Sequence, residues 1–203
     1  KQHHLHLVPG DVGETAFLPG EIKRAKVIAE HFDDYKLVAS NRHYNTFTGT
    51  YKGVKVSVTC TGIGGAATAI AIEELYRVGA KNFIRIGTAG SLPKEVGLGD
   101  VCVTTAAVRD EGASYHYLPP AREVPAPPAG VAVLQRALEA RRLPYRLGKT
   151  WTTDASTSIE SSSTPHVATN GKTRSTTSRF CRSTRLVKTC PSIITAPSLR
   201  EST

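Results

Sequence analysis

The sequence contains no methionine, a single tryptophan, and no apolar run that approaches the length of a membrane-spanning helix. The missing methionine at position 1 indicates a processed or partial N-terminus, and no signal peptide opens the chain. The four cysteines lack metal-type spacing, and Cys60 and Cys102 lie inside apolar, strand-like runs. These features favour a cytoplasmic protein with reduced thiols over a disulfide scaffold, a cysteine-based metal site or a membrane protein.

Acidic residues are also scarce, because 17 Asp and Glu stand against 26 Lys and Arg, for a net charge of +9. Such an excess ordinarily suggests a nucleic-acid partner. Much of it, however, lies in the last fifty residues, where no regular interleaving of aromatic residues offers a stacking surface for bases. We therefore do not expect nucleic-acid binding. The basic residues concerned are Lys172, Arg174, Arg179, Arg182, Arg185, Lys188 and Arg200.

Hydrophobic periodicity predicts strands alternating with helices, which is typical of an α/β domain with a parallel or mixed sheet. From about Ala155 the composition changes to Ser, Thr and Arg, with few apolar residues. We expect one domain over residues 1–155, followed over 156–203 by a tail that is poorly ordered or aberrant. The expected strands are 15–18, 36–40, 44–53, 54–61, 82–86, 101–108 and 145–153, and the expected helices are 21–32, 65–78 and 130–142.

The most informative stretch is Asn82–Leu92, where an apolar strand carries Arg85 and then enters the small-residue loop from Gly87 to Gly90. A buried charge needs a partner, and a glycine-rich turn lets the backbone approach a ligand. This combination predicts an anion site at the end of a strand. The alternative is that Arg85 forms a buried ion pair with Glu73 or Glu74.

Two further junctions, Pro19-Gly20 and Thr61–Gly65, also lead from a strand into a helix. Free N–H groups at a helix start favour an anion. Neither junction has the spacing of the Walker or dinucleotide-binding fingerprints. In α/β sheets, however, ligands collect beyond the carboxyl ends of strands, and all three glycine loops meet that description.

Taken together, five segments resemble successive motifs of the nucleoside phosphorylase family, and most closely those of its uridine phosphorylase branch. The resemblance implies a three-layer α/β/α fold with a central mixed sheet, and the reversible phosphorolysis of uridine to uracil and ribose 1-phosphate. It also implies a homo-oligomer, which is hexameric in the family. The segments are LPGEIKRAKVIA (18–29), VASNRHYNTFTGTYKG (38–53), CTGIGGAATAIAIEEL (60–75), FIRIGTAGSL (83–92) and VRDEGASYHYLPP (108–120).

By the same resemblance, the phosphate site consists of Gly20, Arg24, Arg85 and Thr88, with Arg42 supplied by a neighbouring subunit. His4 reaches across the same interface to the ribose 5′-hydroxyl, although clustered histidines near a chain start are more often surface residues. Thr88 also contacts the ribose, and Ala89 and Gly90 line the base pocket. Arg85 and Thr88 are the catalytic residues. No cofactor is implied, since phosphate is a substrate.

The sequence departs from the family in several places. Gly20-Glu21-Ile22 replaces the usual Gly-Asp-Pro, which removes a proline suited to a helix start. His43 and Ala67 occupy positions where bacterial uridine phosphorylases bind a monovalent cation, so we expect no metal. After Asp154 the family's base-reading and ribose-binding segments are not recognisable, and we interpret the tail as a frame-shifted or otherwise aberrant reading that impairs activity.

Three alternatives therefore stay open. Two belong to the same superfamily: a purine nucleoside phosphorylase, and a nucleosidase in which water replaces phosphate. The third is a non-catalytic remnant that associates with nucleic acid through the basic tail.

Overall fold

A computed structural model describes residues 1–91, 93, 95–154 and 186–189 of the chain. The expected tail at 156–203 lies outside the described residues except for Leu186–Thr189. That short segment forms a strand, although no secondary structure was expected there. Among the described residues, no helix combines the length and apolar character needed to cross a membrane.

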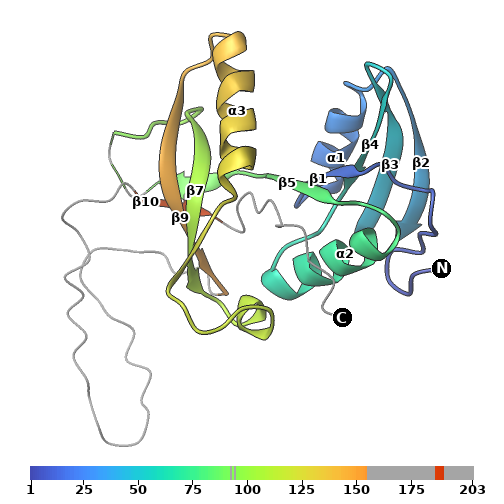
Figure 1. Cartoon of the computed structure of the whole chain (residues 1–203), viewed down its shortest axis with the longest axis horizontal. Helices are drawn as coiled ribbons and strands as arrows, with labels where there is room; N and C mark the ends of the chain where they lie inside the picture. The colour runs from blue at the N-terminus through green and yellow to red at the C-terminus, as the bar shows by residue number, and fades with distance from the viewer. Residues whose placement is uncertain (92, 94, 155–185, 190–203) are drawn as a thin grey trace, which may run out of the picture.

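The structure confirms an α/β fold with mixed sheets and helices. The first sheet has the order β2-β3-β4-β1-β5 and the second has the order β6-β10-β9-β7-β8; each contains parallel and antiparallel pairs. In Figure 1 the first sheet, with α1 and α2, lies on the right, and the second sheet, with α3, lies on the left. The strands are β1 (Thr15–Pro19), β2 (Asp34–Asn41), β3 (Tyr44–Tyr51), β4 (Val54–Thr59), β5 (Asn82–Ile86), β6 (Ala89–Ser91), β7 (Val101–Asp110), β8 (Glu123–Pro125), β9 (Tyr145–Thr153) and β10 (Leu186–Thr189), and the helices are α1 (Ile22–Ala29), α2 (Gly65–Arg77), α3 (Pro128–Ala140) and the 3₁₀ turn η1 (Ala113–His116).

Two helices cover opposite faces of the first sheet, which gives the expected three layers. Residues that alternate along β1 pack on opposite sides, because successive side chains of a strand point to opposite faces. Ala16 and Leu18 join the core beneath α2, and Phe17 packs against the core beneath α1. The α2 core also includes Leu5 and Leu7, so the N-terminal segment is anchored by fully buried side chains.

The helix boundaries differ from the predictions by a few residues. The first helix ends at Ala29 rather than Phe32, since the N–H groups of His31 and Phe32 donate to carbonyls only three residues earlier. Phe32 lies beyond the end of the helix, but it still packs against the core beneath α1, as its apolar spacing predicted. The third helix begins two residues early, at Pro128, a residue well suited to the first turn.

Arg109 organises the loop between β7 and β8. Its buried guanidinium donates to Ser114 Oγ and to the carbonyls of Leu118, Pro119 and Ala121, and it lies 4.1 Å from the ring centre of Tyr115.

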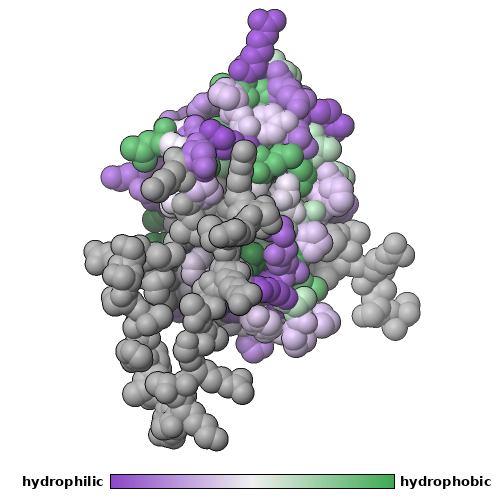
Figure 2. Space-filling view, turned by 90° about the vertical axis from the view of Figure 1, so that its left-hand side faces the viewer, coloured by the Kyte–Doolittle hydropathy of each residue, from purple (hydrophilic) through white to green (hydrophobic). Residues whose placement is uncertain are grey.

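On the face shown in Figure 2, hydrophilic side chains surround small, separate hydrophobic patches.

Candidate active site

The carboxyl ends of three parallel strands meet at one edge of the first sheet. β1 is the central strand, pairing with β4 on one side and β5 on the other. Leu18 stands opposite Arg85 in the register, and the N–H of Thr61 donates to the Pro19 carbonyl at 2.9 Å. This geometry gathers the loops that begin at Gly20, Gly62 and Gly87 at the same edge, where the sequence predicted an anion site.

Arg85 is buried at this edge, with 5% of its surface exposed. It shares a face of β5 with the buried Phe83, as the alternation of a strand requires. Its Nη1 donates to the Leu18 carbonyl at 2.8 Å and to Thr61 Oγ1 at 3.0 Å. These bonds fix the guanidinium plane against the ends of β1 and β4.

The alternative ion pairs of Arg85 are not supported, because both candidate carboxylates have other partners. Glu73 lies 3.0 Å from Arg77, one turn along the same helix. Glu74 accepts hydrogen bonds from His4 and Leu5.

Gly20 lies directly against the guanidinium. A Cβ atom placed on Gly20 would stand 2.8 Å from Nη2 of Arg85 and 3.1 Å from the carbonyl oxygen of Gly62. The absence of a side chain therefore allows three groups to meet: the start of α1, the arginine and the second glycine loop. The Glu21 side chain does not cap α1, so the first-turn N–H groups of the helix lie beside a buried cation. An anion is the ligand that such groups favour.

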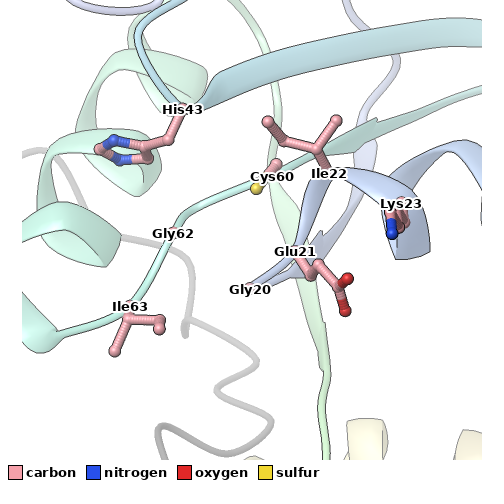
Figure 3. Close-up of a pocket in the computed structure, with 8 residues that line it drawn as sticks. All are labelled: Gly20, Glu21, Ile22, Lys23, His43, Cys60, Gly62 and Ile63. Carbon is pink, nitrogen blue, oxygen red and sulfur yellow. The ribbon is translucent and has the colours of Figure 1, made fainter.

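An open cleft of about 540 Å³ lies at this junction, between the start of α1 and the second glycine loop (Figure 3). The ring of His43 packs against Gly62 and lies 4.0 Å, centre to centre, from the ring of Tyr44. Burial raises the pKa of the Cys60 thiol, so this cysteine is a neutral wall of the cleft. The lining residues are Gly20, Glu21, Ile22, Lys23, His43, Cys60, Gly62 and Ile63.

Of the five residues predicted to bind phosphate, Gly20 lines the cleft, whereas Arg24, Arg42, Arg85 and Thr88 do not. Arg24 is on the first turn of α1, with Nη2 at 3.8 Å from Glu21 Oε2. Arg42 is exposed in the turn between β2 and β3 and has a positive φ of 55°. Thr88 is exposed in the segment that follows β5. The predicted base-pocket residues Ala89 and Gly90 are exposed as well and belong to β6, which pairs with β10 in the second sheet.

His4, in the N-terminal segment, packs against α2, and its Nδ1 is 2.7 Å from Oε1 of Glu74 on that helix. The Asn41 side chain donates to the His4 carbonyl at 2.7 Å. Because Asn41 precedes Arg42, the two residues expected to serve a neighbouring subunit lie on one surface of the chain. The structure thus separates the predicted residues into a junction around Arg85 and a surface around His4 and Arg42.

Among the described residues, no group of three or more His, Cys, Asp or Glu side chains is placed to hold a metal ion.

Several residues of the site were not predicted from the sequence. Thr61 was recognised as part of a glycine-rich junction but not as an acceptor for Arg85. Lys23 and His43 were not predicted to line the cleft, since nothing in their local sequence distinguishes them from surface residues.

The chain is similar to known phosphorylases in both sequence and structure. A family model described as the phosphorylase superfamily matches residues 14–160. The uridine phosphorylase of Thermococcus kodakarensis is 42% identical over 154 residues, covering 76% of this chain and 56% of the relative. A guanosine phosphorylase of Halorubrum lacusprofundi is 44% identical over 117 residues, covering 58% of this chain and 48% of the relative. The chain spans about half the length of these curated relatives.

Solved structures show the same similarity. The purine nucleoside phosphorylase of Toxoplasma gondii in complex with immucillin-H superposes with a TM-score of 0.74 and 35% identity over 79% of this chain and 66% of that chain. The uridine phosphorylase of Vibrio fischeri, complexed with 6-hydroxy-1-naphthoic acid, superposes with a TM-score of 0.73 and 35% identity over 76% of this chain and 64% of that chain.

Proposed function

This chain belongs to the phosphorylase superfamily, and we propose that it catalyses the reversible phosphorolysis of a nucleoside, converting uridine and phosphate to uracil and ribose 1-phosphate. The observation that carries the proposal is the buried guanidinium of Arg85, held against Gly20 at the start of α1. A nucleosidase, which uses water, has no need of a buried cation facing a helix start.

In the proposed reaction a phosphate oxygen attacks the anomeric carbon of ribose while the bond to the base breaks. The electron pair of that bond leaves with the base, and positive charge develops on the sugar. The phosphate must therefore be held close beneath the sugar in one orientation. We assign this task to Gly20, Arg24, Arg85 and Thr88, because a guanidinium offers a rigid fork of donors to a phosphate and glycine N–H groups add further donors.

We further propose that the complete site forms between subunits of a homo-oligomer. Arg42 would reach the phosphate and His4 the ribose 5′-hydroxyl of a nucleoside bound by the neighbouring chain. The Asn41 side chain supports this arrangement, since its bond to the His4 carbonyl joins both residues to one surface. Thr88, Ala89 and Gly90 would line the nucleoside side of the same site. We propose no metal or cofactor.

The setting we propose is cytoplasmic nucleoside catabolism and pyrimidine salvage. Cys60 and Cys102, the cysteines in the described part of the chain, are both free thiols, which fits a reducing compartment. The base preference is the open part of the proposal, because a guanosine phosphorylase is among the relatives of similar identity.

The test is an assay of the purified full chain with uridine, in the presence and absence of phosphate, following uracil and ribose 1-phosphate. We expect uracil release that depends on phosphate. In the Arg85→Lys variant we expect kcat/KM for phosphate to fall about 100-fold, the loss typical of removing a hydrogen-bond donor to the transition state. Arg146→Lys is the matched control, since Arg146 lies on β9 of the second sheet and pairs with Asp100.

Three results would overturn parts of the proposal. Uracil release at the same rate without phosphate would indicate a nucleosidase. Faster turnover of guanosine than of uridine would indicate a purine enzyme. We expect slow turnover, since the family's base- and ribose-binding segments are not recognisable after Asp154. Phosphate binding is therefore measured by calorimetry alongside the assay. No turnover and no phosphate binding would contradict the function altogether.

A further inference from the structure

One buried carboxylate holds the N-terminal segment on helix α2. Glu74 is 5% exposed, and its oxygens accept the N–H of Leu5 at 2.7 Å and the N–H of His4 at 3.0 and 3.1 Å. The same carboxylate lies 2.7 Å from Nδ1 of His4. Burial would raise the pKa of Glu74, but the hydrogen bonds from Leu5 and His4 outweigh it and hold the pKa below its usual value.

This arrangement decides which nitrogen of His4 carries the proton. An ionised carboxylate only accepts hydrogen bonds, so the nitrogen beside it must be the donor. Nδ1 of His4 is therefore protonated, and in the neutral ring Nε2 is left as an acceptor. An acceptor at Nε2 can take the hydrogen bond that a sugar hydroxyl donates.

The main chain of His4 is fixed as firmly as its ring. Asn41 binds its carbonyl oxygen, and the next residue, Leu5, is fully buried in the core beneath α2. Two further charged side chains, Glu73 and Arg77, line a small cavity of about 100 Å³ together with His4. The His3 ring stands edge-on at 4.8 Å. The imidazole keeps only 34% of its side-chain surface exposed.

We propose that Glu74 is a positioning residue for the nucleoside site. It holds His4 with Nδ1 turned to α2, so that Nε2 is the nitrogen available to the 5′-hydroxyl of a nucleoside bound by a neighbouring chain. Glu74 itself touches no substrate, and its effect passes entirely through the orientation and tautomer of His4. This inference rests on the proposed function for its substrate, but its physical claim concerns this chain alone.

The first test needs no turnover. The ¹⁵N chemical shifts of the His4 ring report its tautomer, and we expect the neutral ring of the unmodified chain to carry its proton on Nδ1. In the Glu74→Gln variant we expect a mixture of tautomers, because an amide can donate as well as accept. Glu14→Gln is the matched control: the same chemical change on an exposed side chain that pairs with Lys81 and does not line the cavity beside His4. A proton on Nε2 in the unmodified chain would overturn the proposal, even if Glu74→Gln fails to fold.

The second test compares uridine with 5′-deoxyuridine. Glu74→Gln should lower kcat/KM for uridine about tenfold, the scale of one lost hydrogen bond, and leave 5′-deoxyuridine nearly unchanged. Adding Glu74→Gln to His4→Ala should cause no further loss. Equal losses on both substrates would show a merely structural role and overturn the proposal. If the unmodified chain turns over neither substrate, phosphate binding decides the proposed function, and the tautomer measurement alone decides the role of Glu74.

Discussion

At the scale of single residues, the candidate site depends on how closely Gly20 and Arg85 approach each other. The arginine is held in place by the Leu18 carbonyl and by Thr61 Oγ1. The glycine leaves room for the guanidinium at the start of α1. The burial of Arg85 could be predicted, because it interrupts an apolar strand. Its acceptors could not, since they lie 24 and 67 residues away and meet it only through the pairing of β1, β4 and β5.

Gly20→Ala should disturb this contact. The new Cβ would stand 2.8 Å from Nη2 of Arg85 and 3.1 Å from a backbone oxygen of Gly62. Nη1 of the same guanidinium donates to Leu18 and Thr61, so a shift of the group would strain these hydrogen bonds. We expect phosphate affinity, measured by calorimetry, to fall about tenfold, and the free energy of unfolding, measured in urea, to fall by about 1–2 kcal/mol.

Gly87→Ala is the control for this substitution. Gly87 begins the third loop at the same edge of the sheet, and a Cβ placed there meets no atom within 4 Å. We expect its phosphate affinity and stability to match those of the unmodified chain. Equal effects of the two alanines would show that the space beside Arg85 is not what Gly20 provides.

At the scale of elements, the local sequence of the β3–β4 hairpin specifies the position of the turn, but one of its two turn residues is poorly suited to the turn's conformation. The turn at Lys52-Gly53 was predicted from its position between alternating runs, and both residues adopt positive φ angles of 50° and 76°. Such a turn suits glycine in the second position and asparagine in the first. Lys52 is therefore in a conformation that its side chain disfavours.

Lys52→Asn should stabilise the hairpin, because asparagine tolerates the left-handed conformation better than lysine. We expect the free energy of unfolding in urea to rise by about 0.5 kcal/mol. Gly53→Ala, which forces a side chain into the same conformation, should lower it by about 1 kcal/mol. Two substitutions of the same sign would contradict this account of the turn.

Short elements that depend on contacts with distant residues could not be predicted from the local sequence. The region between β7 and α3 was expected to be a loop, but it contains η1 and the three-residue strand β8, which pairs with β7. The Arg109 guanidinium holds this region through carbonyls spread over several residues. A three-residue strand has no periodicity to detect, so its partner strand defines it.

At the scale of the whole molecule, the sequence predicted the α/β class and the layers but not the division of the strands into two sheets. Alternating apolar runs located seven of the ten strands in the described residues and all three α-helices, and they leave the pairing between distant strands open. Glu111, the residue after β7, links the second sheet to helix α2 beside the first sheet. Its Oε2 would lie 3.1 Å from a Cβ on Gly65, at the start of α2, where a negative charge is favourable.

The stability of the whole chain should depend on pH through Glu74. The pKa of this carboxyl is lowered from its ordinary value of 4.5 in the folded chain, so the unfolded chain takes up a proton first as the pH falls. The stabilisation by Glu74 is therefore complete above about pH 4.5 and is lost as the pH falls through the folded-state pKa. Glu74→Gln removes this contribution and should lower the free energy of unfolding by about 1–3 kcal/mol at pH 7.

The difference between the unmodified chain and Glu74→Gln should shrink as urea titrations are repeated from pH 7 down to pH 3. The pKa values of Asp34 and Asp100 are also lowered, through hydrogen bonds from Thr50 and Arg146, but both proteins keep these groups, so their effect cancels in the difference. Glu14→Gln should match the unmodified chain closely, because the Glu14 side chain is largely exposed and its ion pair with Lys81 lies in solvent. A difference that stays constant with pH would mean that Glu74 acts through its shape and not through its charge.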